Sequence, residues 1–383
     1  MINEFFSRAL NKFNIELPLF NVNKTKYNKT CLISYVKSPF LNRSNVASHQ
    51  NLWQVSEIAR IFGDMGYNVD VIDYTAEKAI LTKKYDSVFD ILARETPVYA
   101  KNLSNNAKKI IYFTGSESKF ANKAEMDRIY DLELRRGVKL QPRRQAPLIH
   151  NSVEEYDCAI MIGNEYNFAT YSDFKLKKPH LVPNTGYDFD FEFDASKKKS
   201  NNFLFFGSAG CVHKGLDLLL EIFSKENFPA NLYVCGAFEN ESDFKDAYEK
   251  ELYHTNNIKA KGFININSDA FKTIASECSY AIMPSCSEAR AGAIATVMSA
   301  GIIPICSKEC GYEDDEVINL TDCKKETIRS FVLEYANKSL DWIEDKSKKV
   351  TDLTKTKYCR AEFTRLMTEA IHDAVTSDQG EEK

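Results

Sequence analysis

The stretch NFLFFGSAGCVHKGLDLLL (202–220) decides the fold of the C-terminal half. Its start, NFLFFG (202–207), is a short apolar run typical of a buried strand, and LDLLLEIFSK (216–225) has the broad apolar stripe of a packed helix. The loop between them contains glycines. A strand, a glycine-containing loop and a helix in this order form the repeating unit of a parallel, doubly wound sheet.

The same alternation continues beyond this unit. The remaining strands and helices of the C-terminal half are predicted at 231–236, 258–263, 269–277 (helix), 280–285, 292–300 (helix) and 302–306. In the N-terminal half, strands are predicted at 31–36, 68–74, 86–92, 108–114, 156–162 and 180–184, with a first helix at 52–65. We therefore predict an α/β protein with two Rossmann-like, doubly wound domains facing each other across a cleft.

The domain boundaries follow from composition. Residues 1–190 are predicted to form the first, acceptor-side domain, with an extension at 1–28, and residues 200–345 the second. The polar segment DFDFEFDASKKKSNN (188–202) is the predicted connection. Residues 346–383 form a helical segment that could pack back on the first domain, ending in a frayed tail.

Composition excludes several classes of protein. The net charge of −4 and the pI near 6.0 give no general attraction to nucleic acid. The ten cysteines show no zinc-ligand spacing, and we interpret them as reduced thiols of a cytoplasmic protein. No apolar window is long enough to span a membrane. Phe6, Leu10 and Phe13 recur at helical spacing, which leaves peripheral contact with the inner face of the membrane open, although packing on the first domain is the simpler interpretation.

Four segments of the C-terminal half carry a resemblance. FFGSAGCVHKGLDLLL, LYVCG, KGF and MPSCSEARAGAIATVMSAGIIPI occur in the order and spacing of GT-B glycosyltransferases resembling the retaining family 4, or group 1, enzymes. The resemblance is strong over 203–311 and loose over the N-terminal half. It implies transfer of a sugar from a nucleotide-sugar to a glycan or lipid-linked acceptor, in surface polysaccharide or glycoconjugate biosynthesis.

The resemblance and the chemistry together assign the site. Lys214 would supply positive charge to the leaving diphosphate, and Glu288 would accept hydrogen bonds from hydroxyls of the donor sugar. For each, a solvated surface residue is the plain alternative. His49, before the first helix, completes the candidate catalytic set of Glu288, Lys214 and His49, with a structural histidine as its alternative. The predicted donor-binding residues are Gly207, Ser208, Gly210, Lys214, Glu288, Arg290, Ala291, Gly292 and Thr296.

The sequence departs from the family pattern at three places. Ser208 stands where many relatives have arginine, and Thr296 where many have a second glutamate that binds the ribose. The loop at 113–125, where relatives often have a histidine, has Ser116 and Glu117 instead. We hypothesise that Arg290 replaces the charge missing at Ser208.

Two further basic features are noted beside the motifs. A cluster of arginines could bind an acceptor phosphate or could be an ordinary solvated face; its members are Arg135, Arg136, Arg143 and Arg144. His213, next to Lys214, is interpreted as a loop residue near the phosphates rather than as an acid. The glycines Gly207, Gly210 and Gly215 would let the backbone approach phosphate oxygens.

The expected mechanism requires no metal and no other cofactor. Lysine, backbone amides and helix dipoles can stabilise the leaving diphosphate, so the acidic DFDFEFD (188–194) is interpreted as a linker and not as a metal site. The leaving phosphate could itself accept the proton of the acceptor hydroxyl. Two alternatives stay open: a nucleotide-sugar epimerase, and a non-catalytic nucleotide-sugar-binding subunit of a glycan-assembly complex.

Overall fold

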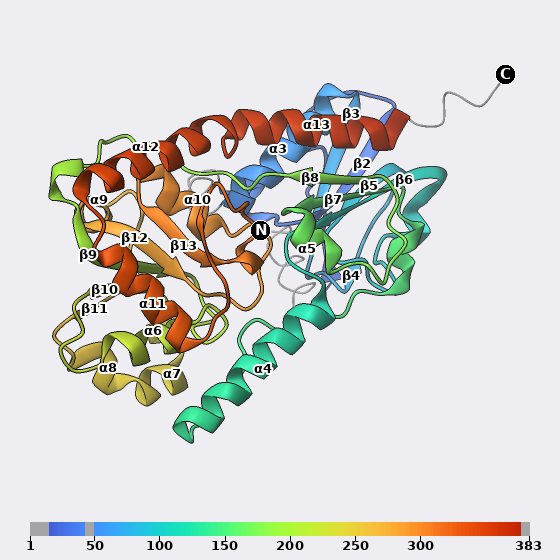
Figure 1. The fold of residues 1–383 in the computed structure, drawn as a ribbon. Coiled ribbons are helices and arrows are strands. Elements are labelled where there is room, and N and C mark those ends of the chain that lie inside the picture. Colours follow the sequence, from blue (N-terminus) through green and yellow to red (C-terminus); the bar gives the residue numbers. More distant parts are fainter. Residues whose placement is uncertain (1–14, 43–49, 377–383) are drawn as a thin grey trace, which may run out of the picture.

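The computed structural model describes residues 15–42 and 50–376. Figure 1 shows two α/β lobes side by side, each built around one twisted sheet with helices on both faces. All strands of the two large sheets run parallel to their neighbours. The predicted fold class of two Rossmann-like domains is confirmed.

The N-terminal sheet has the strand order β3-β2-β5-β6-β7-β8. Its strands are β2 (Lys29–Tyr35), β3 (Tyr67–Asp73), β5 (Tyr85–Asp90), β6 (Leu103–Phe113), β7 (Cys158–Ile162) and β8 (Pro179–Val182). The helices of this lobe are α2 (Ser38–Leu41), α3 (Gln50–Asp64), α4 (Ser118–Arg136) and α5 (Glu165–Ala169). A separate two-stranded sheet pairs β1 (Ile15–Glu16) with β4 (Lys78–Ala79).

The C-terminal sheet has the strand order β11-β10-β9-β12-β13-β14. Its strands are β9 (Lys199–Gly207), β10 (Asn231–Gly236), β11 (Ile258–Gly262), β12 (Cys278–Met283), β13 (Ile303–Ser307) and β14 (Ile318–Leu320). The helices of this lobe are α6 (Leu216–Phe223), α7 (Ser242–Ala247), α8 (Glu249–Tyr253), α9 (Asp269–Glu277), α10 (Gly292–Ser299), α11 (Lys325–Ala336) and α12 (Leu340–Thr356).

Hydrophobic periodicity located most of these elements. The face of α3 expected to be apolar is buried, with Val55, Ile58, Ala59 and Phe62 at most 1% exposed. Helix α9 begins and ends at the predicted residues. The short edge strand β14 was not predicted, because INL is too brief to show a period.

The segment that connects the lobes (188–202) is polar in composition, but its phenylalanines make apolar contacts. Phe189 and Phe193 pack against Phe271 of α9, with ring centroids 5.7 Å and 6.3 Å away. The acidic residues that alternate with these phenylalanines lie between positions anchored to the C-terminal lobe. The connection is therefore attached to one lobe along part of its length.

Two helices cross between the lobes. Helix α13 (Arg360–Thr376) follows the C-terminal lobe in sequence but packs on the N-terminal one, where Phe363, Met367 and Ile371 are fully buried (Figure 1). Helix α4 does the reverse: Ile129 and Leu132 join the core cluster of the C-terminal lobe. Each lobe thus contributes a helix to the packing of the other. Within the described residues, no helix has the length and apolarity needed to cross a bilayer.

Candidate active site between the lobes

The strand order of the two large sheets indicates where the candidate site lies. In the C-terminal sheet the order reverses between β9 and β12, and the loops that follow these strands carry Lys214 and Glu288. In the N-terminal sheet the reversal lies between β2 and β5. Ligands of doubly wound sheets bind at the carboxyl ends of strands where the order reverses. The fold therefore brings residues 74 positions apart to one point of the C-terminal lobe.

Lys214 and Glu288 form a buried ion pair at this point. The Lys214 ammonium donates to Oε1 of Glu288, and the hydroxyl of Ser285 donates to the same oxygen at 3.1 Å. Burial alone would raise the pKa of Glu288, but Lys214, followed by His213 and Arg144, lowers that pKa to about 2. Glu288 is therefore ionised at neutral pH, and the two principal residues predicted from sequence contact each other.

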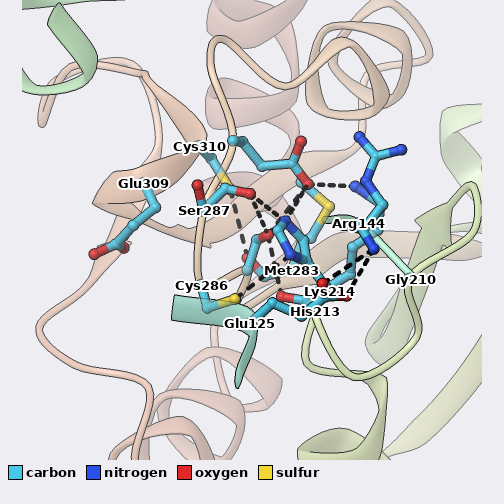
Figure 2. Close-up of polar contacts among 12 residues, drawn as sticks. Glu125, Arg144, Gly210, His213, Lys214, Met283, Cys286, Ser287, Glu309 and Cys310 are labelled. Carbon is cyan, nitrogen blue, oxygen red and sulfur yellow. Dashed lines mark hydrogen bonds and ion pairs between the residues drawn. The ribbon is translucent and has the colours of Figure 1, made fainter. Parts of the chain in front are cut away.

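His213 lies beside this pair as a neutral side chain. Its Nε2 contacts the carbonyl oxygen of Ser287, which can only accept, so we place the proton on Nε2. Its Nδ1 faces the thiol of Cys286 at 3.7 Å. Burial lowers the pKa of His213; Glu288 acts in the opposite direction and Lys214 in the same one, and the pKa stays below its ordinary value. Figure 2 shows His213 among Lys214, Ser287 and Cys286. A neutral imidazole bonded to the backbone is not poised as an acid.

The glycine loop between β9 and α6 is held from inside the lobe. The amide of Gly210 donates to Glu241 at 2.5 Å, and the amide of Cys211 donates to the same carboxylate at 3.2 Å. Gly215 has φ +78°, and a Cβ there would lie 2.6 Å from Cγ of Pro284. Gly207 packs near Cδ of Lys214, and Ser208 is exposed. The loop glycines thus serve close packing around Lys214, and two of the loop amides bind a carboxylate of the protein.

Helix α10 begins at the predicted anion-binding position. Its N-cap, Ala291, provides no side-chain cap, so the first-turn amides at Gly292 have no side-chain acceptor from that residue. Thr296 lies one turn later and is 2% exposed. Its hydroxyl donates to the carbonyl of Gly292 at 2.8 Å, and Nε2 of Gln50 contacts the Thr296 oxygen at 3.2 Å. Thr296, which stands where the sequence comparison expects a ribose-binding glutamate, therefore contacts the N-terminal lobe.

Arg290 occupies the interior of the C-terminal lobe. Its Nε donates to the carbonyl of Gly311 at 2.8 Å, and its guanidinium lies over the rings of Tyr312 and Tyr358. The nearest carboxylate is Glu313, at 3.8 Å. Arg290 does not line the pocket described below, in contrast to its neighbour Ala289.

A pocket of about 220 Å³ lies between the lobes beside Glu288. Its lining is Ile91, Leu92, Phe113, Thr114, Gly115, Ser116, Ser118, Ala121, Arg144, Ala146, Pro147, Ile149, Tyr171, His213, Ser287, Glu288 and Ala289. Most of these follow the N-terminal strands β5 and β6 or belong to the segment 144–149. The pocket therefore opens on the N-terminal lobe and has the loop at Ser287, Glu288 and Ala289 of the C-terminal lobe as one wall.

Direct bonds join the two walls. The amide and hydroxyl of Ser116 both donate to the carbonyl of Glu288, the amide at 3.1 Å. Nδ2 of Asn167, a fully buried residue, donates to the carbonyl of Glu309 at 3.1 Å and lies 3.4 Å from that of Glu288. Glu117 caps α4 by accepting from the amide of Phe120. The loop that lacks a histidine thus fixes the backbone of Glu288.

Several site residues were not found from sequence. Asn167 and Gln50 contact the opposite lobe, and Glu241 binds the glycine loop. Asn164 and Asn167 form a capping box at the start of α5, and this spacing after a strand was the available signal. His49, the third predicted catalytic residue, lies outside the described residues.

The described residues contain no cluster of three or more histidine, cysteine, aspartate or glutamate side chains placed to bind a metal ion.

Comparison with known families gives the reaction class. Residues 188–357 match the family of glycosyl transferases, group 1. The chain carries a group 1 glycosyltransferase domain. This confirms the resemblance derived from the loops at Lys214 and Glu288, and the protein is a glycosyltransferase. No curated protein sequence matches the chain.

Solved structures share the two-lobed fold of this glycosyltransferase. A sucrose-phosphate synthase from Thermosynechococcus elongatus matches with a TM-score of 0.61 at 12% identity, over 90% of this chain and 98% of the other. A glycosyltransferase from Rickettsia africae matches with a TM-score of 0.59 at 12% identity, over 92% and 100%. Anabaena HepE, solved with UDP-glucose, matches with a TM-score of 0.58 at 10% identity, over 90% and 99%. At these identities the likeness concerns the fold.

Proposed function

We propose that this glycosyltransferase takes a nucleotide-sugar as donor, retains the anomeric configuration and requires no metal ion. The single observation that supports this most directly is the contact between Lys214 and Glu288 at the strand-order reversal, close to the uncapped start of α10. A diphosphate placed there would meet a lysine and free backbone amides. HepE, of similar fold, has been solved with UDP-glucose.

The proposed chemistry separates binding from proton transfer. Lys214 and the α10 amides stabilise the charge that collects on the leaving diphosphate. Glu288, ionised at neutral pH, orients the donor sugar by accepting from its hydroxyls. The leaving phosphate accepts the proton of the attacking hydroxyl on the same face of the sugar, which retains configuration. His213 stays neutral and holds the loop of Ser287.

The acceptor is proposed to be a glycan or lipid-linked sugar in surface polysaccharide or glycoconjugate synthesis, handled by a cytoplasmic enzyme that can contact the inner face of the membrane. The N-terminal pocket beside Glu288 gives an acceptor access to the donor sugar. Closure of the lobes would keep water from the donor.

A glycosyl-transfer assay tests this proposal. The full chain is incubated with UDP-, GDP-, ADP- and CMP-sugars and a panel of acceptors, with and without EDTA, and products are analysed by mass spectrometry and by the anomeric coupling in NMR. Glu288→Gln should reduce turnover at least a hundredfold. Glu309→Gln is the matched control, because its carboxylate accepts from the hydroxyl of Tyr166 and points away from the cluster in Figure 2. Inverted products, loss of activity in EDTA, or equal effects of the two variants would contradict the proposal.

A second candidate function is a non-catalytic nucleotide-sugar-binding subunit. The observation that favours it is the use of Thr296, at the ribose position, for a contact with Gln50. Calorimetric binding of a nucleotide-sugar without transfer to any acceptor, and without isomerisation of the donor, would support this candidate over catalysis.

A further inference from the structure

The four clustered arginines differ in their ion-pair partners in the folded protein. Arg135 pairs with the buried carboxylate of Asp217, Arg136 pairs with Glu251 at 2.8 Å, and Arg143 pairs with Asp243. These three join α4 and the segment after it to the C-terminal lobe. Only Arg144 among the four has no ion pair or side-chain hydrogen bond to a described residue.

Arg144 is nevertheless held in a defined place. Its amide donates to both oxygens of Glu125, at 2.9 and 3.1 Å, and Glu125 is 2% exposed. The same carboxylate accepts from the amide of Arg143 and from the side chain of Gln145. The aliphatic stem of Arg144 lies against Gly210, where a Cβ would come within 2.7 Å of its Cγ (Figure 2). Glu125 therefore fixes the backbone, and Gly210 makes room for the stem.

The charge balance of the pocket points to an anionic ligand. Among the lining residues that the structure describes, the charged groups are Arg144 and Glu288, and Glu288 pairs with Lys214. His213 is neutral because burial lowers its pKa. The rest of the lining is apolar or hydroxyl-bearing. The described charges, Lys214 and Arg144 against Glu288, thus leave a net positive charge beside a pocket on the acceptor side of the site.

We propose that this pocket binds an acceptor carrying a phosphate or carboxylate group, and that Arg144 binds that group. The inference rests on the proposed function, which it narrows from any glycan acceptor to an anionic one. The planar guanidinium forms two parallel hydrogen bonds with either anion. The volume of about 220 Å³ lies below the ~300–1,000 Å³ typical of drug-sized ligand sites, which suits a single charged sugar unit.

The first test uses inorganic phosphate as the probe. The full chain is saturated with the nucleoside diphosphate that binds it best, which blocks the donor diphosphate site, and phosphate is titrated by calorimetry. Arg144→Gln should weaken phosphate binding at least tenfold. Arg143→Gln is the matched control. The Arg143 amide donates to the same Glu125 carboxylate, but the Arg143 guanidinium forms an ion pair with Asp243. This variant should bind phosphate as the unchanged protein does.

Three results would overturn the inference. They are absence of phosphate binding to the unchanged protein, equal binding by Arg144→Gln, and a loss of nucleoside diphosphate affinity in Arg144→Gln as large as its loss of phosphate affinity. The last result would assign Arg144 to the donor diphosphate. If no nucleoside diphosphate binds the unchanged protein, the proposed function fails instead, and the phosphate titration can still be made without nucleotide.

Kinetics give a second readout. Acceptors are compared in pairs that differ only by a phosphate or carboxylate, such as glucose and glucose 6-phosphate or glucose and glucuronate. Arg144→Gln should raise KM for the charged member at least tenfold and leave KM for the neutral member unchanged. Equal changes for both members, or a preference of the unchanged enzyme for the neutral one, would refute an anionic acceptor.

Discussion

Replacing Lys214 by methionine will measure the electrostatic coupling at the centre of the site. The side chains of Lys214 and Glu288 are 5% and 11% exposed. The pKa of Glu288 falls from its ordinary value of 4.5 to about 2, because Lys214, followed by His213 and Arg144, outweighs the effect of burial. Since one pKa unit corresponds to 1.36 kcal/mol, ionised Glu288 is stabilised by about 3 kcal/mol in the folded protein.

The pH dependence follows from the sign of this change. The folded pKa of Glu288 lies below the unfolded one, so the stabilisation is present above about pH 4.5 and is lost as the pH falls from there toward 2. Without Lys214, Glu288 is left buried and unpaired, which raises its pKa. Lys214→Met should therefore lower the free energy of unfolding by about 3 kcal/mol at pH 7 and by less at pH 4.

A double-mutant cycle isolates this coupling. Urea unfolding is measured for Lys214→Met, Glu288→Gln, the double variant and the unchanged protein. The double variant should be more stable than the sum of the single effects predicts, and this excess should be larger at pH 7 than at pH 4. Lys123→Met, which removes an exposed pair with Asp127, is the control and should change nothing measurable. Additive single effects would refute the assignment of the low pKa to this pair.

Three further changes test the packing around the site. Arg135→Met should cost up to about 3 kcal/mol in urea unfolding at pH 7, because the buried Asp217 loses its ion pair and keeps only the charge of Arg128. The cost should be smaller at pH 4, since burial raises the pKa of Asp217 and its carboxyl can then protonate. Gly215→Ala should cost more than about 1 kcal/mol and lower the melting temperature, because of its positive φ and the contact with Pro284. Phe363→Ala should cost about 3–5 kcal/mol and expose the N-terminal lobe to limited proteolysis, because α13 is buried there.

Much of the fold could be predicted because its signals are local. Runs such as NFLFFG and the apolar face of α3 carry strand and helix periods within one element, and each lies within a few residues of its predicted place. The motif residues Lys214 and Glu288 were identified from the resemblance to a known family and from their place in loops that follow strands. The edge strand β14 was missed because three residues show no period.

The contacts that individual charged side chains make in the folded protein could not be predicted from the sequence. Sequence made Arg290 the replacement for the charge missing at Ser208, but its guanidinium is placed over Tyr312 and Tyr358 by the packing of the C-terminal lobe. Likewise, four neighbouring arginines are equivalent in sequence, and only their partners in space separate Arg144 from the rest. The Lys214–Glu288 pair joins residues 74 positions apart, and the Gln50–Thr296 bond joins residues 246 positions apart, beyond any local pattern.

By itself, the sequence determined two parallel α/β units and the loops that carry the glycosyltransferase motifs, because strand and helix periods and glycine-containing loops are properties of short segments. Only the tertiary structure decided that α4 and α13 each pack on the opposite lobe, that Thr296 contacts Gln50, and that Arg144 faces the pocket. The physical reason is that these outcomes depend on which surfaces meet, and on which charges are neutralised, when distant parts of the chain are brought together.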